Sequence, residues 1–278
     1  MQITASYIRL ALLDCYPAGE AAALARVVCC EMLGQSATDY YLGKSLEVTP
    51  AQAREVDAIV ARLQRYEPIQ YIQRRARFLG RDFEVEPGVL VPRPETEELV
   101  ELIVRETPPG KHILDVGTGS GCIAISLAKE LEDARVEAWD VSEPALEVAR
   151  RNSLRLQAQV AFARHDVLRH EPRPEERFDL IVSNPPYVTE AEKADMQRNV
   201  LDWEPALALF VPDDDPLRFY RAIGWLGRQM LLPGGRLYFE INRAFGQATR
   251  QMLEVMGYTH VRLQKDLSGN DRFIIAEK

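Results

Sequence analysis

The residues Asn184–Tyr187 read Asn-Pro-Pro-Tyr and directly follow an apolar run that predicts a strand. The two prolines stiffen the backbone and remove two N–H donors, while the carbonyl oxygen of Pro185 remains available as an acceptor. The side chain of Asn184 adds a second carbonyl oxygen, and two acceptors in a rigid frame suit the two donors of a planar NH₂ group. The ring of Tyr187 offers a face on which that group can stack. We therefore expect Asn184, Pro185, Pro186 and Tyr187 to hold an amide or an aryl amine.

A second motif predicts a sharp turn between a strand and a helix, because residues 115–121 read Asp-Val-Gly-Thr-Gly-Ser-Gly. A dinucleotide fingerprint needs glycine at its first, third and sixth positions, whereas here the sixth position is Cys122 and the fifth is Gly121. A pyrophosphate is therefore not the obvious ligand. Asp140 ends the next predicted strand, where a carboxylate can accept hydrogen bonds from ribose hydroxyls. Together these residues predict a ligand with a ribose and no pyrophosphate, and the alternative is a tight turn without a ligand.

This combination resembles the S-adenosylmethionine site of class I methyltransferases. In that class an acid after the third strand often meets the adenine amino group, and Asp166 and Val167 follow the third predicted strand here. The alternative for Asp166 is a loop acid in contact with solvent. The residues expected to bind the cofactor are Gly117, Thr118, Gly119, Ser120, Gly121, Asp140, Asp166, Val167 and Asn184.

The expected chemistry is attack of a weakly nucleophilic nitrogen on the sulfonium methyl group. The lone pair of an amide or aryl amine is delocalised, so fixing both N–H bonds points the nitrogen at the methyl group and favours charge development during transfer. No strong base is required before the attack, because the proton can leave afterwards. The alternative interpretation of Asn184–Tyr187 is a structural turn rich in proline.

The elements that must position these motifs alternate between helix and strand from about residue 94 onward. Such alternation predicts an α/β fold with a mainly parallel, doubly wound sheet. Ligands of such sheets bind beyond the carboxyl ends of the strands, where both motifs lie. The predicted strands are Lys111–Val116, Val136–Trp139, Val160–Ala163, Phe178–Val182, Gly235–Ile241 and Phe273–Ala276.

Residues 1–67 predict a small helical domain that binds a partner or has a structural role. One helix is expected to begin at Thr49, which can form a capping box with Gln52, and to bury a stripe within Val56–Leu63. Residues 68–93 contain short β-prone runs on both sides of Glu86-Pro87-Gly88, which predict a hairpin linker. The remaining residues, 94–278, are expected to form the catalytic domain.

The composition is that of a globular protein, with 46% hydrophobic and 27% charged residues in a chain of 278. The net charge of −8 disfavours a general coat on nucleic acid. The four cysteines have no metal-ligand spacing, so we expect free thiols in a reducing compartment and no metal. The sequence contains neither a bilayer-spanning apolar stretch nor a signal-peptide pattern, which favours a cytoplasmic protein.

Four further segments resemble the bacterial release-factor glutamine methyltransferases, the HemK/PrmC family. They are Glu-Pro-Ile-Gln-Tyr-Ile at 67–72, Val-Leu-Val-Pro-Arg-Pro-Glu-Thr-Glu-Glu-Leu-Val at 89–100, Glu-Pro-Ala-Leu-Ala-Leu at 204–209 and Asp-Leu-Ser-Gly-Asn-Asp-Arg at 266–272. The resemblance implies a class I methyltransferase fold and S-adenosyl-L-methionine as the methyl donor, with S-adenosyl-L-homocysteine as the product. It also implies that the substrate is the glutamine side chain in the Gly-Gly-Gln motif of peptide chain release factors.

The resemblance also implies that Arg93, Pro94, Glu95 and Thr96 help to wall the substrate site, for which a hairpin end and a helix cap are the alternative. The sequence departs from the family where Asn242 replaces a common glycine and where residues 210–215 replace a glycine-rich stretch. A glycine is also common where Arg74 or Arg75 stands. A cluster of arginines in 62–81 is either a partner surface or a set of solvated charges.

Two competing hypotheses come from other classes of function. The Asn-Pro-Pro-Tyr motif also occurs in enzymes that methylate adenine amino groups, so a DNA or RNA methyltransferase is the second hypothesis. The net charge and the lack of an aromatic-rich segment for base recognition disfavour it. The third hypothesis is a non-catalytic adaptor with a degenerate methyltransferase fold, and the intact motifs disfavour it.

Overall fold

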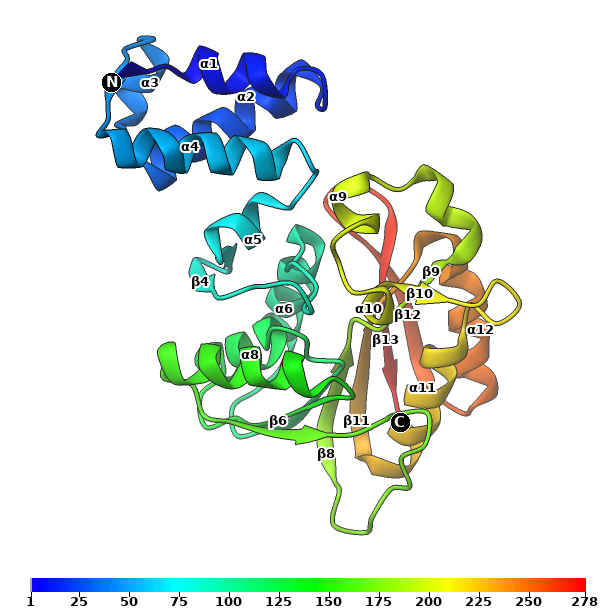
Figure 1. The fold of residues 1–278 in the computed structure, drawn as a ribbon. Helices are drawn as coiled ribbons and strands as arrows, with labels where there is room; N and C mark the ends of the chain where they lie inside the picture. The colour runs from blue at the N-terminus through cyan, green and yellow to red at the C-terminus, as the bar shows by residue number, and fades with distance from the viewer. Residues whose placement is uncertain (1) are drawn as a thin grey trace. The chain divides into compact units, whose positions relative to one another are not determined.

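The computed structural model describes residues 2–278, which divide into two compact units (Figure 1). The first unit contains the described residues up to Arg75 together with Gln197–Trp203. The second unit contains Ala76–Met196 and Glu204–Lys278. The assignment of separate roles to 1–67, 68–93 and 94–278 stays a prediction.

The first unit is a small helical domain. Its α4 helix begins with the predicted capping box: the N–H of Gln52 donates to Oγ1 of Thr49 at 3.2 Å, and the N–H of Thr49 donates to Oε1 of Gln52 at 2.9 Å. The buried stripe of α4 includes Val56, Ile59 and Leu63, which pack into the core of the unit. The elements of the unit are β1 (Gln2–Ile3), α1 (Ala5–Leu12), α2 (Ala18–Arg26), η1 (Val27–Met32), α3 (Ala37–Tyr41), β2 (Leu46–Glu47), α4 (Pro50–Leu63), α5 (Ile69–Gln73) and α9 (Arg198–Leu201).

The second unit is built on a seven-stranded sheet with the order β12-β13-β11-β8-β5-β6-β7. Strands β11, β8, β5, β6 and β7 are parallel, whereas β13 lies antiparallel to both β11 and β12. The predicted mainly parallel, doubly wound sheet is confirmed. The strands are β5 (His112–Val116), β6 (Arg135–Asp140), β7 (Val160–Arg164), β8 (Phe178–Ser183), β11 (Leu231–Glu240), β12 (Thr259–Lys265) and β13 (Asp271–Glu277).

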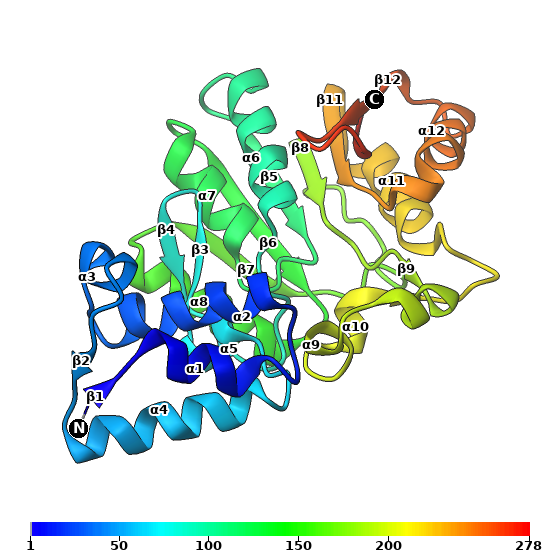
Figure 2. The ribbon, with the colours of Figure 1, turned by 90° about the horizontal axis from the view of Figure 1, so that it is seen from above.

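Helices cover both faces of this sheet (Figure 2). Because successive strand residues point to opposite faces, Ile113 packs with the helices of one layer and Leu114 with those of the other. Apolar residues of α6 and α7 form the first core, and residues of α11 and α12 form the second. The helices are α6 (Pro94–Glu106), α7 (Cys122–Glu130), α8 (Glu143–Arg155), α11 (Arg218–Met230) and α12 (Gly246–Val255).

The hairpin before the sheet exists, but its turn is not the predicted one. Strands β3 (Ala76–Phe78) and β4 (Arg81–Phe83) pair antiparallel around Leu79 and Gly80. Both turn residues have positive φ, 45° and 73°, which is the geometry that closes a two-residue hairpin. Glu86-Pro87-Gly88 does form the predicted turn, in which the N–H of Val89 donates to the carbonyl oxygen of Glu86 at 3.2 Å. The paired strands β3 and β4 both lie before it, so the prediction that the hairpin closes there was wrong, and the turn leads to the pocket instead.

Short elements follow the predicted substrate motif along the chain. Strands β9 (Val188–Thr189) and β10 (Phe210–Val211) pair in parallel, and the N–H of Tyr187 donates to the carbonyl oxygen of Leu209 at 3.2 Å. These bonds tie the motif to the α10 segment. The remaining elements are η2 (Glu190–Asp195), α10 (Ala206–Leu209) and η3 (Arg243–Phe245).

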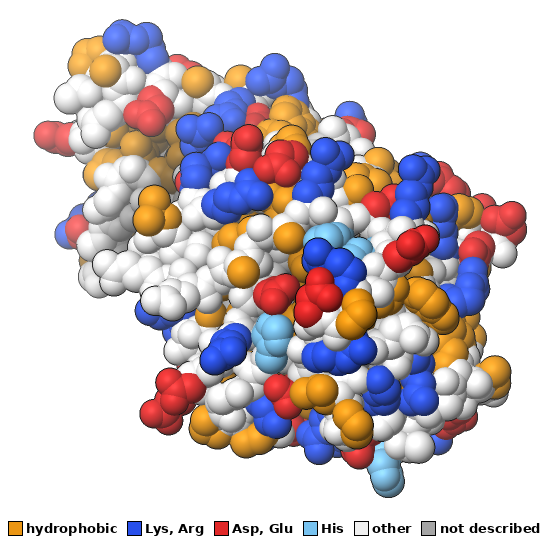
Figure 3. All heavy atoms as spheres, turned by 90° about the horizontal axis from the view of Figure 1, so that it is seen from below, with side chains coloured by type: hydrophobic (Ala, Val, Ile, Leu, Met, Phe, Trp, Pro, Cys, Tyr) orange, Lys and Arg blue, Asp and Glu red, His pale blue; other side chains and the backbone are white. Residues whose placement is uncertain are grey.

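The surface carries both signs of charge. Figure 3 shows basic and acidic side chains interspersed over one face of the molecule. Several arginines of the 62–81 cluster form ion pairs, namely Arg62–Glu67, Arg75–Glu31 and Arg81–Glu130. Among residues 2–278, no helix combines the length and the apolar composition that crossing a bilayer requires.

Candidate active site

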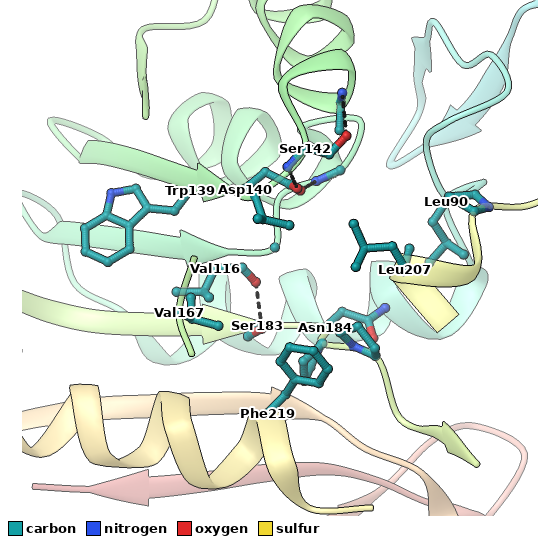
Figure 4. Close-up of a pocket in the computed structure, with 18 of the residues that line it drawn as sticks. Leu90, Val116, Trp139, Asp140, Ser142, Val167, Ser183, Asn184, Leu207 and Phe219 are labelled. Atoms are coloured by element: carbon teal, nitrogen blue, oxygen red, sulfur yellow. Dashed lines mark hydrogen bonds between the residues drawn. The ribbon is translucent and has the colours of Figure 1, made fainter. Parts of the chain in front are cut away.

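One pocket opens at the carboxyl ends of β5, β6 and β8 (Figure 4). The hydroxyl of Ser183, at the end of β8, donates to the carbonyl oxygen of Val116, at the end of β5, at 2.6 Å. This bond fixes the two central strands together where the pocket begins. The predicted site residues that line the pocket are Gly117, Gly119, Asp140, Asp166, Val167, Asn184, Pro185 and Pro186.

The glycines of the turn have different roles. Gly117 and Gly119 have φ values of +77° and +55°, and a Cβ added to either would meet no atom within 4 Å. They therefore form an open cradle in which a ligand can approach the backbone. A Cβ on Gly121 would lie 2.9 Å from Cδ1 of Ile125 and 3.1 Å from Cβ of Ala149. Gly121 is thus needed for close packing of α7 against α8, and it does not line the pocket.

The two polar residues of the turn, Thr118 and Ser120, are not among the residues that line the pocket. Thr118 is buried, and its hydroxyl donates to Oδ2 of Asp115 at 2.7 Å. Ser120 is buried as well, and its carbonyl oxygen accepts a hydrogen bond from Nδ2 of Asn152 at 2.9 Å. Both residues shape the turn, and their predicted contact with the cofactor stays a prediction.

Asp115, to which sequence reasoning gave no role, is fully buried next to the glycine turn and is not among the residues that line the pocket. Its Oδ2 accepts the hydroxyl of Thr118 and the N–H of Ala124, whereas its Oδ1 is buried without a hydrogen-bond partner in the described residues. Complete burial raises the pKa of this carboxyl to about 7. An unpaired buried acceptor beside the glycine cradle suits a ligand with a hydrogen-bond donor. The sequence signal that could have identified Asp115 is its position as the first residue of the glycine motif.

Asp140 lies at the end of β6 and is held by the backbone. Its Oδ2 accepts the N–H of Gly119 and its Oδ1 accepts the N–H of Ser142, both at 2.9 Å (Figure 4). Burial raises the pKa of the carboxyl, and the two backbone bonds oppose that shift. Each carboxylate oxygen keeps a further lone pair for a ligand hydroxyl.

Apolar side chains form the remaining walls of the pocket. Leu90 and Leu207 lie together on one side in Figure 4, whereas Trp139 and Val167 lie on the other. Leu207 is 61% exposed at the pocket margin. An apolar pocket with a few convergent polar groups suits a purine ring attached to a ribose. Sequence reasoning missed Leu90, in a loop, and Leu207, in the short helix α10, since a leucine carries no chemical signal that marks it as part of a site.

Asn184 faces the pocket and is anchored by residues from other elements. Its Nδ2 donates to Oγ1 of Thr96 at 3.2 Å, and the Thr96 hydroxyl donates to Oε2 of Glu240 at 2.7 Å. The hydroxyl of Tyr187 donates to Oε1 of the same carboxylate at 3.1 Å. Burial raises the pKa of Glu240, and the positive charge of Arg272 opposes this shift. The family resemblance implied that Thr96 helps to wall the site, but its bonds to Asn184 and Glu240 were not predicted, and Glu240 was not identified from the sequence.

Three residues expected at the substrate are not in the pocket lining. The ring of Tyr187 packs against the core formed with α11 and α12, and its stacking on a substrate stays a prediction. Arg93 is in an ion pair with Glu204, with 2.6 Å between Nη2 and Oε1, and Oε2 of Glu204 accepts the N–H of Val91. Glu95 lies in the first turn of α6. The substrate roles of Arg93 and Glu95 also stay predictions.

Asn242, one of the departures from the family pattern, supports the substrate motif. Its Nδ2 donates to the carbonyl oxygen of Tyr187 at 3.1 Å and also contacts the carboxylate of Glu192. That carboxylate closes a capping box on Thr189. The asparagine therefore links the segment after Asn184–Tyr187 to the end of β11.

Comparison with known proteins agrees with this arrangement. Residues 8–73 match the PrmC N-terminal domain, and residues 94–202 match the methyltransferase small domain. The release factor glutamine methyltransferase of Bacteroides thetaiotaomicron is 57% identical over 277 residues, which cover 100% of this chain and 99% of the relative. That of Flavobacterium psychrophilum is 45% identical over 241 residues, 85% of this chain and 84% of the relative. A methyltransferase from Pyrococcus furiosus shares the fold, with a TM-score of 0.53 at 19% identity over 82% of this chain and 98% of its own.

Proposed function

Since the chain belongs to the family of release factor glutamine methyltransferases, we propose that its pocket holds S-adenosyl-L-methionine next to a glutamine side chain of a release factor. The bound cofactor supplies a sulfonium methyl group and leaves as S-adenosyl-L-homocysteine. The acceptor is the side-chain amide nitrogen, N5, of the glutamine in the Gly-Gly-Gln motif. The observation that carries this proposal is that Asn184 and Pro185 line the same pocket as Gly117, Gly119 and Asp140.

The residues of the pocket fit this cofactor in size and polarity. The open backbone at Gly117 and Gly119 leaves room for the methionine part, and Oδ1 of Asp115 offers an acceptor for its ammonium group. Asp140 would accept the ribose hydroxyls, since both of its oxygens are fixed by backbone donors. Asp166 follows the end of β7 and lines the pocket beside Val167, where it would accept a hydrogen bond from the adenine amino group.

The substrate amide would be held by two acceptors. Oδ1 of Asn184 and the carbonyl oxygen of Pro185 would each accept one N–H of the glutamine NH₂ group. Pro185 and Pro186 keep these acceptors rigid, so the nitrogen lone pair is aimed at the methyl group without a prior deprotonation. Tyr187 would fix the loop through its hydroxyl bond to Glu240 and complete the site with its ring. Arg93 would shape the entrance through its ion pair with Glu204, and Glu95 would do so from the first turn of α6.

The partner expected from this chemistry is a protein loop. Two glycines next to the target glutamine would let a narrow loop enter the pocket without side-chain clashes. The helical domain would bind the rest of the release factor and supply binding energy away from the reacting amide. Because release factors act on cytoplasmic ribosomes, we place the activity in the cytoplasm. A nucleic-acid substrate is disfavoured by the net charge of −8.

The decisive experiment measures methyl incorporation by mass spectrometry into three acceptors. They are an intact release factor, the same factor with its target glutamine changed to glutamate, and DNA that contains adenine. We expect methylation of the intact factor alone, because glutamate has no NH₂ group to donate to Asn184 and Pro185. Methylation of DNA with none on the intact factor would favour the nucleic-acid hypothesis instead.

A further inference from the structure

We propose that Thr96 and Glu240 are positioning residues that determine which atom of the Asn184 side-chain amide faces the substrate. An asparagine amide has nearly the same shape when it is turned by 180°, but its donor and acceptor then exchange places. The proposed function requires the oxygen, not the nitrogen, of Asn184 to face the glutamine NH₂ group. The proposal therefore rests on the proposed function and adds the device that sets this orientation.

The direction of each hydrogen bond in the chain follows from the chemistry of Glu240. A carboxylate can only accept, so the single hydroxyl proton of Thr96 is committed to Oε2 of Glu240, at 2.7 Å. Oγ1 of Thr96 can then only accept from Asn184, which places Nδ2 of Asn184 against it at 3.2 Å. The Oδ1 atom of Asn184 is left for the pocket.

Burial makes this chain of hydrogen bonds specific. Thr96 is 3% exposed and Glu240 is 1% exposed, so bulk water does not compete for either partner. Tyr187 occupies the other carboxylate oxygen with its hydroxyl. Burial raises the pKa of Glu240, whereas the two hydroxyl bonds and the charge of Arg272 favour its ionised form. The negative charge of Glu95 opposes ionisation of Glu240. With both oxygens of Glu240 accepting from hydroxyl groups, Thr96 has no alternative acceptor of comparable strength.

The orientation of Asn184 decides between an amide and a carboxylate in the pocket. With Oδ1 facing the pocket, a glutamine NH₂ group is bound and a glutamate carboxylate is repelled. With Nδ2 facing the pocket, Asn184 would favour the glutamate carboxylate over the glutamine NH₂ group. Thr96 and Glu240 thus select for glutamine over glutamate without touching the substrate.

The test is the Glu240→Gln variant, which keeps the shape but adds a donor. Nε2 of the new side chain would donate to Thr96, whose hydroxyl proton would then turn to Asn184 and reverse its amide. We expect kcat on the intact release factor to fall by about tenfold to hundredfold, with unchanged affinity for S-adenosylhomocysteine. We also expect the release factor with glutamate at the target position to inhibit the variant more strongly than it inhibits the parent enzyme. A loss of packing alone would not improve binding of that factor.

A second pair of variants keeps the proposal testable if Glu240→Gln fails to fold. Thr96→Val removes the hydroxyl and should lower kcat to a similar extent, whereas Thr96→Ser keeps the hydroxyl and should retain most of it. The matched control is Glu106→Gln. Glu106 is a half-buried acid that forms an ion pair with Arg262 and accepts a hydrogen bond from the hydroxyl of Tyr238. Tyr238 lies on β11, as Glu240 does. The control should keep its kcat.

The outcomes separate this proposal from the proposed function. If the parent enzyme does not methylate the intact release factor, the proposed function fails. If the parent is active and folded Glu240→Gln or Thr96→Val matches it in kcat, the positioning role is wrong. The positioning role is also wrong if Glu240→Gln loses activity without any gain in inhibition by the glutamate-bearing factor.

Discussion

Thr96 and Glu240 are hydrogen-bonded at 2.7 Å, although 144 residues separate them in the sequence. Thr96 lies in the first turn of α6, and Glu240 ends β11 in the middle of the sheet. The orientation of Asn184 therefore depends on how α6 packs against the sheet. The Asn-Pro-Pro-Tyr motif therefore needs both α6 and β11 to hold the amide of Asn184 in the orientation that the substrate requires.

Replacing Asp140 by alanine should weaken cofactor binding. Loss of the ribose hydrogen bonds to a carboxylate should lower the affinity for S-adenosylhomocysteine about tenfold to hundredfold. Isothermal titration calorimetry measures the change, with Glu254→Ala on the exposed face of α12 as the control. Unchanged affinity in a folded Asp140→Ala protein would remove Asp140 from the cofactor site.

Replacing Asn184 by alanine should nearly abolish turnover and spare cofactor binding. Alanine removes one of the two acceptors for the substrate NH₂ group, and positioning of this kind contributes on the order of 3 kcal/mol to the transition state. The prediction is a fall in kcat of at least about a hundredfold. Steady-state kinetics and calorimetry on the same preparation test it. A near-normal kcat would contradict the role of two acceptors.

Alanine substitutions should separate the two kinds of glycine in the turn. Both Gly119→Ala and Gly121→Ala place a side chain at positive φ, which costs about 1 kcal/mol of strain. Gly121→Ala also brings Cβ within 3.1 Å of Ala149, and this overpacking should cost about a further 1–3 kcal/mol of stability. Gly119→Ala should lose more cofactor affinity, because its Cβ enters the cradle. Thermal unfolding and calorimetry compare the two, and equal melting temperatures would argue against the packing role of Gly121.

Asp115 should make the free protein less stable as pH rises. Its pKa is about 7 in the folded chain and near its ordinary value of 3.8 when unfolded, so the folded state keeps a proton that the unfolded state releases. The stabilising contribution is complete below about pH 4 and is lost as pH rises through about 7. Asp115→Asn does not titrate, so its stability relative to the parent should increase on the order of 2–4 kcal/mol between pH 4 and pH 8. Urea unfolding without cofactor at both pH values measures this, and a pH-independent difference would show that Asp115 is already ionised.

Most parallel strands of the sheet could be predicted from the sequence. The apolar run Phe178–Val182 became β8 with one added residue, because central parallel strands are buried on both faces and leave a continuous apolar signal. The edge strand β12 was missed. Its residues Thr259–Lys265 are mostly polar and exposed, His260 has a φ of 49°, and its register shifts along β13. An edge strand of this kind lacks both the periodicity and the regular pairing on which prediction depends.

The glycine motif and the Asn-Pro-Pro-Tyr motif could be located because their residues are adjacent in the sequence. The resemblance implied that Thr96 helps to wall the site, but the hydrogen-bond network behind the motifs could not be predicted, since Thr96 lies 88 residues before Asn184 and 144 residues before Glu240. From the sequence, Glu240 at the end of a predicted strand cannot be told from an acid in contact with solvent. Its burial follows only from the position of β11 inside the sheet. The adjacent residues of the motif also do not show that the ring of Tyr187 packs against the core formed with α11 and α12, and its stacking on a substrate stays a prediction.

The antiparallel strand β13 has a consequence for the folding of the chain. It inserts between β11 and β12 and brings Arg272 towards Glu240, so the charge balance behind Asn184 forms only after a long-range pairing is complete. Contacts between residues far apart in sequence form slowly, since loop closure must precede them. A chain that has folded only its early strands would already possess the glycine cradle but not the oriented amide. Competence to bind the methyl donor should thus arise earlier during folding than competence to use it.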